Sequence, residues 1–356
     1  MSKDAFASAV AFALSHESSW TRDTGPGWGI HHLDPAPYNR LRGPVHARGP
    51  ASGTVFLDGR SVCVWGEPDR PDLTFSVAKT YLALLAGVAH DRGLLTDVDE
   101  PVARRLPGIG FDDGRNREVT WAHLLQQTSE WEGECFGLPD RVDRYRVVAF
   151  QEVLEPGTKG DSRELRAPGT FWEYNDVRVN QLSLALLHLF GEPLPDVFRE
   201  TIARPVGASE NWRWAGYDDA WIELRGRRVQ SVPGGTHWGA GVSISSDDQA
   251  RIGQMVLDDG MVDGRRVLSR EWLARMRAPC SIAPFYGYLL WLNTGRRIFP
   301  SAPESSCFAF GAGSSFTWIE PERRMVVVVR WIEADAADAF FAKILAAVDT
   351  PGRRSP

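Results

Sequence analysis

The stretch TFSVAKTYLALLAG, residues 74–87, places a serine three residues before a lysine at the start of an apolar helical pattern. Positions i and i+3 of a helix lie on one face, so the hydroxyl of Ser76 and the amine of Lys79 come within hydrogen-bonding reach. A serine hydroxyl is a weak nucleophile, and a neighbouring amine activates it by accepting its proton where the surroundings favour the neutral amine. Serine is also a favoured helix N-cap, so the spacing alone leaves a purely structural role for Ser76 open.

Composition limits the classes of function. The chain has 356 residues and a formal net charge of -6, and its arginines are interspersed with acidic residues. No basic run is present that would follow a phosphate backbone, so nucleic-acid binding is not expected. No apolar run reaches the ~20 residues of a membrane span, and the N-terminus lacks the pattern of a signal peptide, so we expect a cytoplasmic protein without a membrane partner. The sequence gives no indication of oligomeric state.

The cysteines and histidines do not form a metal-binding pattern. The four cysteines are far apart and contain no C-x-x-C pair, which favours reduced thiols over a disulfide framework or a zinc site. They are Cys63, Cys135, Cys280 and Cys307. No H-E-x-x-H motif occurs, and the His31-His32 pair stands alone. We therefore expect neither a metal nor another cofactor.

Alternating apolar patterns predict two β-hairpins, one near each end of the chain. The strands are expected at residues 53–57 and 61–65 around Asp58-Gly59-Arg60, and at 315–319 and 325–331 around residues 320–323. A further short strand is expected at 241–245. The two ends of the sequence therefore share one antiparallel sheet.

Helical periodicity predicts a helix at each end of the chain. Residues 4–16 carry Phe6, Val10 and Leu14 at helical spacing, and residues 336–348 repeat the pattern with Phe340, Ile344 and Val348. The middle of the chain is helical and loop-rich, with helix caps at Thr120 and at Asn175 or Asp176. We expect an α/β (α+β) fold: residues 1–92 and 234–356 form a sheet-and-helix domain, residues 93–233 a mostly helical insertion domain, and the active site lies between them.

Further segments occur in the order found in a known superfamily. They are GLLTDVDEPV (93–102), VTWAHLLQQTS (119–129), PGTFWEYND (168–176), GAGVSISSDDQAR (239–251) and FGAGSS (310–315). Together with the serine–lysine helix, they resemble the serine β-lactamase and penicillin-binding-protein superfamily over residues 53–331. Within it, EYNDVRVN (173–180) and HWG (237–239) are most similar to cytoplasmic esterases and 6-aminohexanoate-oligomer (nylon-oligomer) hydrolases. The resemblance implies a β-lactamase/transpeptidase-like fold.

The resemblance also implies the roles of individual residues in acyl transfer. Ser76 would attack the carbonyl, Lys79 would take its proton, and the Tyr174 phenol would pass a proton to the leaving group. The backbone amides of Ser76 and Ser314 would form the oxyanion hole. Taken alone, Tyr174 is better interpreted as a buried core phenol, and it is the resemblance together with Ser76 that favours the catalytic role.

Two departures from the superfamily pattern concern substrate recognition. The third motif has Gly311, followed by Ala312 and Gly313, where the superfamily has a cation that holds a substrate carboxylate. These glycines suit close approach of a substrate to a strand edge, or a simple bulge. The second motif ends in Asp176, where the superfamily usually has asparagine. Asp176 can receive a substrate ammonium group or cap the following helix.

His237 and Trp238 complete the set of candidate site residues. His237 can contact the substrate or play a structural role, and Trp238 can form part of the cleft wall together with Trp131 and Trp172. None of the tryptophans has a role that its spacing assigns. The shape of the acyl pocket is expected to depend on the loops at residues 21–50 and 130–166.

The sequence therefore predicts a cytoplasmic serine hydrolase that cleaves small esters or amides through an acyl-Ser76 intermediate. Nylon-oligomer-type amides are one candidate substrate, and activity toward β-lactams is expected to be weak at most. Two alternatives stay open, a non-catalytic binding or scaffold protein on the same fold and an acyltransferase. In each case the expected partner is a small molecule.

Overall fold

A six-stranded antiparallel sheet forms the body of the structure, a computed structural model that describes residues 3–25, 27–148 and 156–349. The strand order is β12-β13-β14-β15-β1-β2, so strands from both ends of the chain pair directly through β1 and β15. The strands are β1 Ser52–Leu57, β2 Arg60–Trp65, β12 Trp291–Leu292, β13 Cys307–Gly311, β14 Ser315–Glu320 and β15 Met325–Arg330. The expected antiparallel sheet, shared by the two ends of the sequence, is confirmed.

Both hairpins form where the sequence predicts them. The β1–β2 turn consists of Asp58 and Gly59, whose φ angles are 47° and 76°. Positive φ at both central positions is what a two-residue hairpin turn requires, because it matches the twist of the flanking strands. In the second hairpin, β14 and β15 pair with Glu320 opposite Met325.

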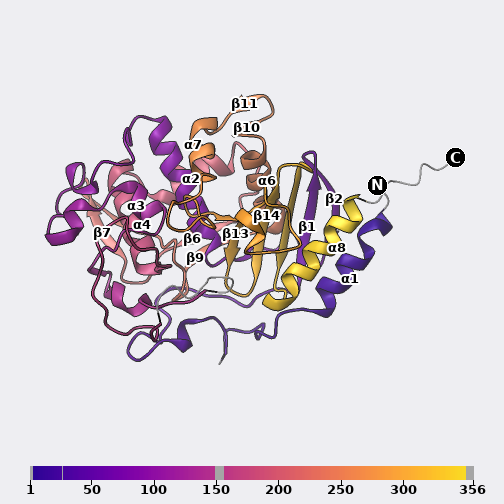
Figure 1. Ribbon diagram of the computed structural model, residues 1–356, viewed down its shortest axis with the longest axis horizontal. Helices are drawn as coiled ribbons and strands as arrows, with labels where there is room; N and C mark the ends of the chain where they lie inside the picture. Colours follow the sequence, from indigo (N-terminus) through magenta and orange to yellow (C-terminus); the bar gives the residue numbers. More distant parts are fainter. Residues whose placement is uncertain (1–2, 26, 149–155, 350–356) are drawn as a thin grey trace.

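Helices cover both faces of this sheet. The helices of this part of the chain are α1 Ala7–Ser15, α2 Val77–Asp91, α6 Ser246–Leu257, α7 Arg270–Met276, which packs on α2, and α8 Ala337–Asp349. On β14, the rings of Phe316 and Trp318 contact Phe341 of α8, whereas Thr317 and Ile319 lie against α6. Side chains alternate between the two faces of a strand, so α8 and α6 must lie on opposite faces. Figure 1 shows α1 and α8 together beside the sheet.

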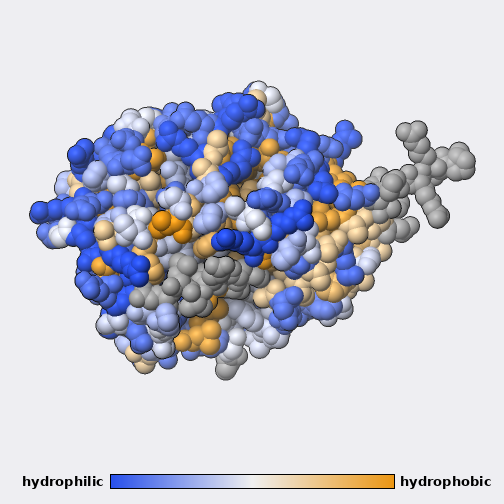
Figure 2. All heavy atoms as spheres, viewed as in Figure 1, coloured by the Kyte–Doolittle hydropathy of each residue, from blue (hydrophilic) through white to orange (hydrophobic). Residues whose placement is uncertain are grey.

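The N-terminal helix faces the core with two of its three predicted residues, since Phe6 is buried and Val10 is half-buried against the core, but Leu14 is not among them. Phe6, Ala9 and Ala13 are buried, whereas Leu14 is 50% exposed. Helix α1 packs against α8, and the α1 residues that are fully buried are the two alanines, whereas Leu14 lies toward solvent. Figure 2 shows a pale apolar area over α1 and α8, on a face that is otherwise mostly hydrophilic.

The middle of the chain is helical and loop-rich, as the sequence predicts, and Figure 1 shows α3 and α4 at the end of the molecule opposite α8. Its helices are α3 Trp121–Leu125, α4 Asp176–Phe190 and α5 Leu194–Phe198. Its strands are short: β4 Glu134–Cys135, β5 Leu138–Pro139, β6 Arg213–Ala215, β7 Trp221–Leu224 and β8 Arg227–Gln230. Thr120 caps α3, and α4 begins at its cap Asn175 and ends at Gly191 in the left-handed conformation. The division into domains at residues 92 and 233 stays a prediction.

The strand expected at residues 241–245 forms, but in a second sheet. It is β9 (Gly241–Ile244), which pairs with β3 (Asp72–Leu73) on one side and with β6 on the other. A small hairpin of β10 (Met261–Val262) and β11 (Arg265–Arg266) follows α6. Because β3 directly precedes Ser76, this second sheet fixes the backbone that leads into α2.

Helix α2 is the central element of the fold. Residues 77–89 are buried, and α2 packs against α4, α5 and α7 as well as against β13 and β14. It therefore carries Ser76 and Lys79 at the junction of the sheet and the helical part of the chain. In the part of the chain that the structure describes, no helix combines the length and the apolar character needed to cross a bilayer.

Gly311, at the end of β13, lies directly against the backbone that precedes Ser76. A Cβ atom at this position would lie 2.0 Å from the carbonyl oxygen of Thr74. Any other residue would therefore push β13 away from the start of α2. This contact accounts for the glycine that stands here in place of a cation.

We expect Gly311→Ala to lower the free energy of unfolding by about 2–3 kcal/mol, because a methyl group forced against backbone strains both segments. Urea denaturation monitored by tryptophan fluorescence measures the difference. Gly25→Ala is the matched control, since no atom lies within 4 Å of the position of its Cβ. Equal stability of the two variants would contradict the close contact with Thr74.

Candidate active site

The hydroxyl of Ser76 is available for chemistry. Ser76 occupies the N-cap position of α2, yet its side chain makes no capping hydrogen bond. Instead, Lys79 Nζ donates a hydrogen bond to Ser76 Oγ at 2.7 Å, as the i, i+3 spacing predicts. The capping role that the sequence left open is therefore not the one that Ser76 plays in the structure.

The residue before Ser76 has a strained backbone. Phe75 has a φ of 49°, a conformation that bulky residues rarely adopt. Its buried ring contacts the rings of Trp20, Trp28 and Trp331, and these contacts stabilise the strained conformation. The aromatic cluster therefore fixes the turn that presents Ser76 at the start of the helix.

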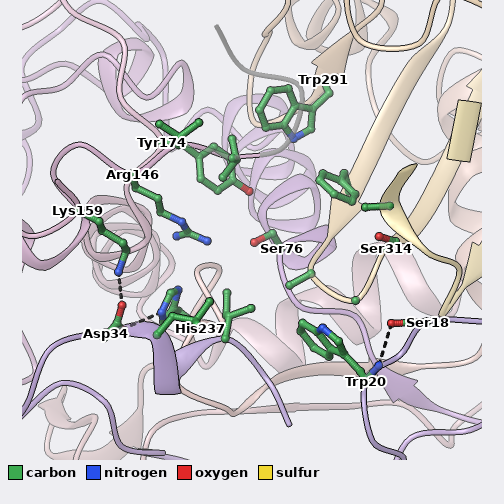
Figure 3. A pocket seen from close by; sticks show the side chains of 18 of the residues that line it. Ser18, Trp20, Asp34, Ser76, Arg146, Lys159, Tyr174, His237, Trp291 and Ser314 are labelled. Carbon is green, nitrogen blue, oxygen red and sulfur yellow. Dashed lines mark hydrogen bonds and ion pairs between the residues drawn. The ribbon is translucent and has the colours of Figure 1, made fainter. Parts of the chain in front are cut away.

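Lys79 lies behind Ser76, between a carboxylate and an aromatic ring. Its Nζ is 2.5 Å from Asp176 Oδ1 and 4.5 Å from the centre of the Tyr174 ring. Its side chain is 1% exposed, so solvent does not screen these contacts. Figure 3 shows the Tyr174 hydroxyl pointing toward Ser76, so the three residues predicted to be catalytic lie together.

Asp176 is the first residue of α4, and its buried carboxylate is surrounded by positive charge. Asp176 Oδ2 lies 2.7 Å from Arg146 and 3.7 Å from His237 Nδ1, and Oδ1 faces Lys79. Burial alone would raise the pKa of Asp176, but Arg146 and Lys79 outweigh it and hold this pKa well below its ordinary value. The carboxylate is therefore ionised at neutral pH.

A second group of charges continues from Asp176. Asp143 accepts a hydrogen bond from the Asp176 backbone amide at 2.8 Å and pairs with Arg146 at 3.3 Å and with Lys159 at 3.1 Å. Lys159 also pairs with Asp34, which comes from the N-terminal segment. We call these side chains, with those around Asp176, the buried charge cluster; it comprises Asp34, Lys79, Asp143, Arg146, Lys159, Asp176 and His237.

A cavity of about 350 Å³ opens in front of Ser76. Ionic groups of the cluster line one side of it, as Figure 3 shows for Arg146, Lys159, Asp34 and His237. The apolar residues of its wall are Trp20, Ile30, Leu33, Val147, Val148, Trp291, Phe310, Ala312 and Ala334. The two loops expected to shape the acyl pocket, residues 21–50 and 130–166, both contribute to this wall.

The third motif forms the tight connection between β13 and β14. Ala312, Gly313 and Ser314 line the cavity, and Ser314 has a φ of 54°. Figure 3 places Ser314 on the side of Ser76 that is opposite Arg146. The position is suitable for a backbone amide that stabilises negative charge on a carbonyl oxygen bound next to Ser76.

The other predicted site residues are placed as follows. His237 lines the cavity, where its Nε2 lies 2.8 Å from Asp34 Oδ2. Trp238 is fully buried and donates hydrogen bonds to Asp34 and to the Tyr38 carbonyl, so it supports the N-terminal segment and does not line the cavity. Trp131 also lies away from the cavity, and its indole donates to the Gly110 carbonyl.

Asp176 itself does not line the cavity, and its oxygens are engaged by Lys79 and Arg146. Helix α4 is capped by Asn175, whose side chain accepts a hydrogen bond from the Arg178 amide. The geometry favours an electrostatic role of Asp176 toward Lys79. Contact between Asp176 and a substrate ammonium group stays a prediction that these contacts do not support.

The sequence did not indicate Arg146, Asp34 or Lys159 as site residues. All three lie in irregular segments without a readable period, and their function depends on contacts between positions far apart in the chain. One signal was available. A buried Asp176 beside Lys79 requires a further cation, and arginine is the residue that pairs best with a buried carboxylate.

Comparison with known families agrees with this arrangement. The sequence profile of the Beta-lactamase family matches residues 67–342. The chain belongs to the Beta-lactamase family. The match includes Ser76, Lys79, Tyr174 and the connection between β13 and β14, and the family membership makes this protein a member of a family of hydrolases.

Proteins similar to this chain include one named as a 6-aminohexanoate-dimer hydrolase and structures described as a hydrolase and as a carboxylesterase. The 6-aminohexanoate-dimer hydrolase of Paenarthrobacter ureafaciens is 26% identical over 218 residues, which are 59% of this chain and 52% of that protein. The match therefore spans about half the length of this relative. One similar solved structure is EstCE1, which is described as a hydrolase with promiscuous acyltransferase activity. It has a TM-score of 0.61 and is 16% identical, and the match covers 97% of this chain and 99% of the EstCE1 chain. A family VIII carboxylesterase has a TM-score of 0.58 and is 16% identical, and the match covers 83% of this chain and 91% of the carboxylesterase chain. These structures share the fold.

The cluster makes a prediction about stability. Burial would raise the pKa of Asp143, but Arg146 and Lys159 outweigh it and lower this pKa. Asp143→Asn removes one carboxylate partner from Arg146 and from Lys159. We therefore expect the free energy of unfolding at pH 7 to fall by about 2–4 kcal/mol.

Because the folded state favours the ionised form of Asp143, its contribution is complete above the pKa of an unfolded aspartate, about 4, and is lost as the pH falls through the folded value. The difference between the wild type and Asp143→Asn should therefore be constant from pH 8 to about pH 5 and shrink below about pH 4. Urea denaturation at several pH values measures it, with the exposed Asp69→Asn as control. A difference that grows on acidification would contradict this account.

Proposed function

We propose that this protein is a serine hydrolase that cleaves small esters or amides through an acyl intermediate on Ser76. One observation carries the proposal. The Ser76 hydroxyl is not used as a helix cap, lines a cavity of about 350 Å³, and accepts a hydrogen bond from the buried amine of Lys79. A hydroxyl paired with a potential base at the edge of a cavity is the arrangement that nucleophilic catalysis requires.

In the proposed acylation step, Ser76 Oγ forms a bond to the substrate carbonyl carbon while its proton moves to the neutral amine of Lys79. The negative charge on the carbonyl oxygen would be stabilised by the backbone amides of Ser76 and Ser314, and the positive end of α2 adds to this stabilisation. The bond to the leaving group then breaks as the Tyr174 phenol donates its proton, and Tyr174 recovers a proton from Lys79. Water repeats the sequence in place of the leaving group and releases the acid.

The cavity supports a preference for substrates with an apolar group and no carboxylate. Its wall contains the rings of Trp20, Trp291 and Phe310, which favour alkyl or aromatic groups. The cations that line it, Arg146 and Lys159, are each paired with aspartates. A substrate carboxylate would have to compete with these ion pairs, which is a reason to expect weak activity toward β-lactams.

An amide substrate is supported by the curated relative, whose name describes hydrolysis of a 6-aminohexanoate dimer. Transfer of the acyl group to an alcohol or amine is a second candidate, since the apolar wall can hold such an acceptor in place of water. Faster turnover of an ester on addition of an alcohol, with an ester as the product, would identify transfer.

The proposal predicts that Ser76→Ala and Lys79→Ala each reduce kcat/KM for a nitrophenyl ester on the order of 10³-fold or more, because each removes a group that acts in the transition state. A fluorophosphonate should label Ser76 in the wild type, which intact-protein mass spectrometry followed by peptide mapping detects. Ser61→Ala, on the exposed part of β2, is the control and should retain activity. Full activity of Ser76→Ala would contradict the proposal. Absence of both labelling and turnover in the wild type would favour the non-catalytic alternative.

The role of Tyr174 makes a separate prediction. An amine is a poor leaving group and depends on protonation more than a nitrophenolate does, so Tyr174→Phe should slow amide cleavage at least about tenfold more than cleavage of a nitrophenyl ester. The comparison uses an anilide and an ester with the same acyl group. Tyr288→Phe, which does not line the cavity, is the control. Equal losses for both substrates would argue against Tyr174 as the acid.

A further inference from the structure

The carboxylate beside Lys79 conflicts with the role of a base. Lys79 can accept the Ser76 proton only as a neutral amine, but an isolated negative charge 2.5 Å from its Nζ stabilises the ammonium form. Both side chains are 1% exposed, so water does not weaken this interaction. Another group must compensate the charge of Asp176 for Lys79 to act.

Arg146 is placed to provide this compensation. Its guanidinium binds Asp176 Oδ2 at 2.7 Å, while Lys79 faces the other oxygen of the same carboxylate. Arg146 is itself buried, and its guanidinium carbon lies 5.2 Å from the centre of the Tyr174 ring. The two cations therefore share one carboxylate from opposite sides, next to Tyr174.

We propose that Arg146 is a positioning residue that neutralises Asp176, so that the Arg146–Asp176 ion pair acts on Lys79 as an uncharged group would. This inference rests on the proposed function, because it concerns the base of that reaction. An aspartate next to the base is compatible with catalysis because Arg146 pairs with its carboxylate, so Lys79 does not face an uncompensated negative charge.

The other titratable groups that face Asp176 include the buried phenols of Tyr217 and Tyr286, whose pKa values are raised by burial and by the neighbouring negative charge, so both stay neutral. Lys79 faces Ser76, Tyr174 and Asp176. Arg146 also pairs with Asp143, whose second cation is Lys159, and Lys159 in turn pairs with Asp34. His237 lies between the carboxylates of Asp34 and Asp176 and, when protonated, takes a further share of their charge. Among the described residues, Arg146 is the permanently charged side chain that contacts Asp176 without being the proposed base.

The test is a double-mutant cycle read as a pH profile. Arg146→Gln removes the arginine that compensates Asp176 next to Lys79, so the acidic limb of kcat/KM for a nitrophenyl ester should move about one pH unit or more to higher pH. Each unit corresponds to about a tenfold loss of activity below the limb. Adding Asp176→Asn removes the uncompensated charge, and the double variant Asp176→Asn/Arg146→Gln should return the limb to within about 0.5 unit of the wild type.

Two further variants separate charge from shape. Arg146→Lys keeps the positive charge and should retain the position of the limb. Arg141→Gln, in the same segment but exposed, makes the same change in net charge and should leave the profile unchanged. If Arg146→Gln does not fold, the double variant and Arg146→Lys still test the inference, because both are predicted to keep the wild-type limb.

The inference is wrong if Arg146→Gln lowers activity equally at all pH values, or if the double variant is no closer to the wild type than Arg146→Gln. It is also wrong if the double variant or Arg146→Lys displaces the limb. A wild type that neither turns over the ester nor reacts with a fluorophosphonate at Ser76 would instead overturn the proposed function, and this inference with it. The two failures are therefore distinguishable in the same set of measurements.

Discussion

The contact between Asp176 and Lys79 places a buried negative charge next to the amine that touches Ser76, and the surrounding structure compensates for this charge. Isolated charges are costly to bury, and a buried ion pair is tolerated only when its geometry and its remaining hydrogen bonds are satisfied. Here the compensation extends from Arg146 to Asp143, Lys159 and Asp34. Cations and carboxylates alternate along this series of ion pairs, which ends at side chains that line the cavity.

The cluster also joins segments that are far apart in the sequence. Asp34 comes from the N-terminal segment, Lys79 from α2, Asp143 and Arg146 from the long connection before α4, and His237 from the approach to β9. Buried ion pairs of this kind contribute little to net stability compared with apolar packing, but they are demanding about geometry. Their effect here is to fix how these segments meet around Ser76, while the apolar core around α2 and the sheet supplies the stability.

Much of the fold could be predicted because the deciding signals are local. The turn at Asp58 and Gly59 and the helix caps at Thr120 and Asn175 act within a few residues of their own position, and the structure has each of them where the sequence predicts it. The i, i+3 spacing of Ser76 and Lys79 is local in the same sense. Leu14 was wrongly assigned to the buried face, because which side of α1 is buried depends on partners such as α8 that lie far away in the sequence.

The surroundings of Ser76 could be predicted only in part, for the same reason. Arg146, Lys159 and Asp34 acquire their roles from partners that no spacing in the sequence relates, and Trp238 was misread because a buried indole has the same sequence signal as one that lines a cleft. The sequence shows that a negative charge is present at Asp176, but it does not show in which direction the side chain points. The structure shows that it points toward the base and away from the cavity.

The cavity wall has a consequence for how such a protein can change over time. Ile30, Leu33 and Val147 line the cavity from connections outside the sheet and outside α2, whereas Ser76 and Lys79 belong to the most deeply buried helix. Substitutions in those connections alter the space offered to a ligand without disturbing the core. Ligand preference can therefore change through substitutions in the connections, whereas a substitution in the buried helix would also disturb the core.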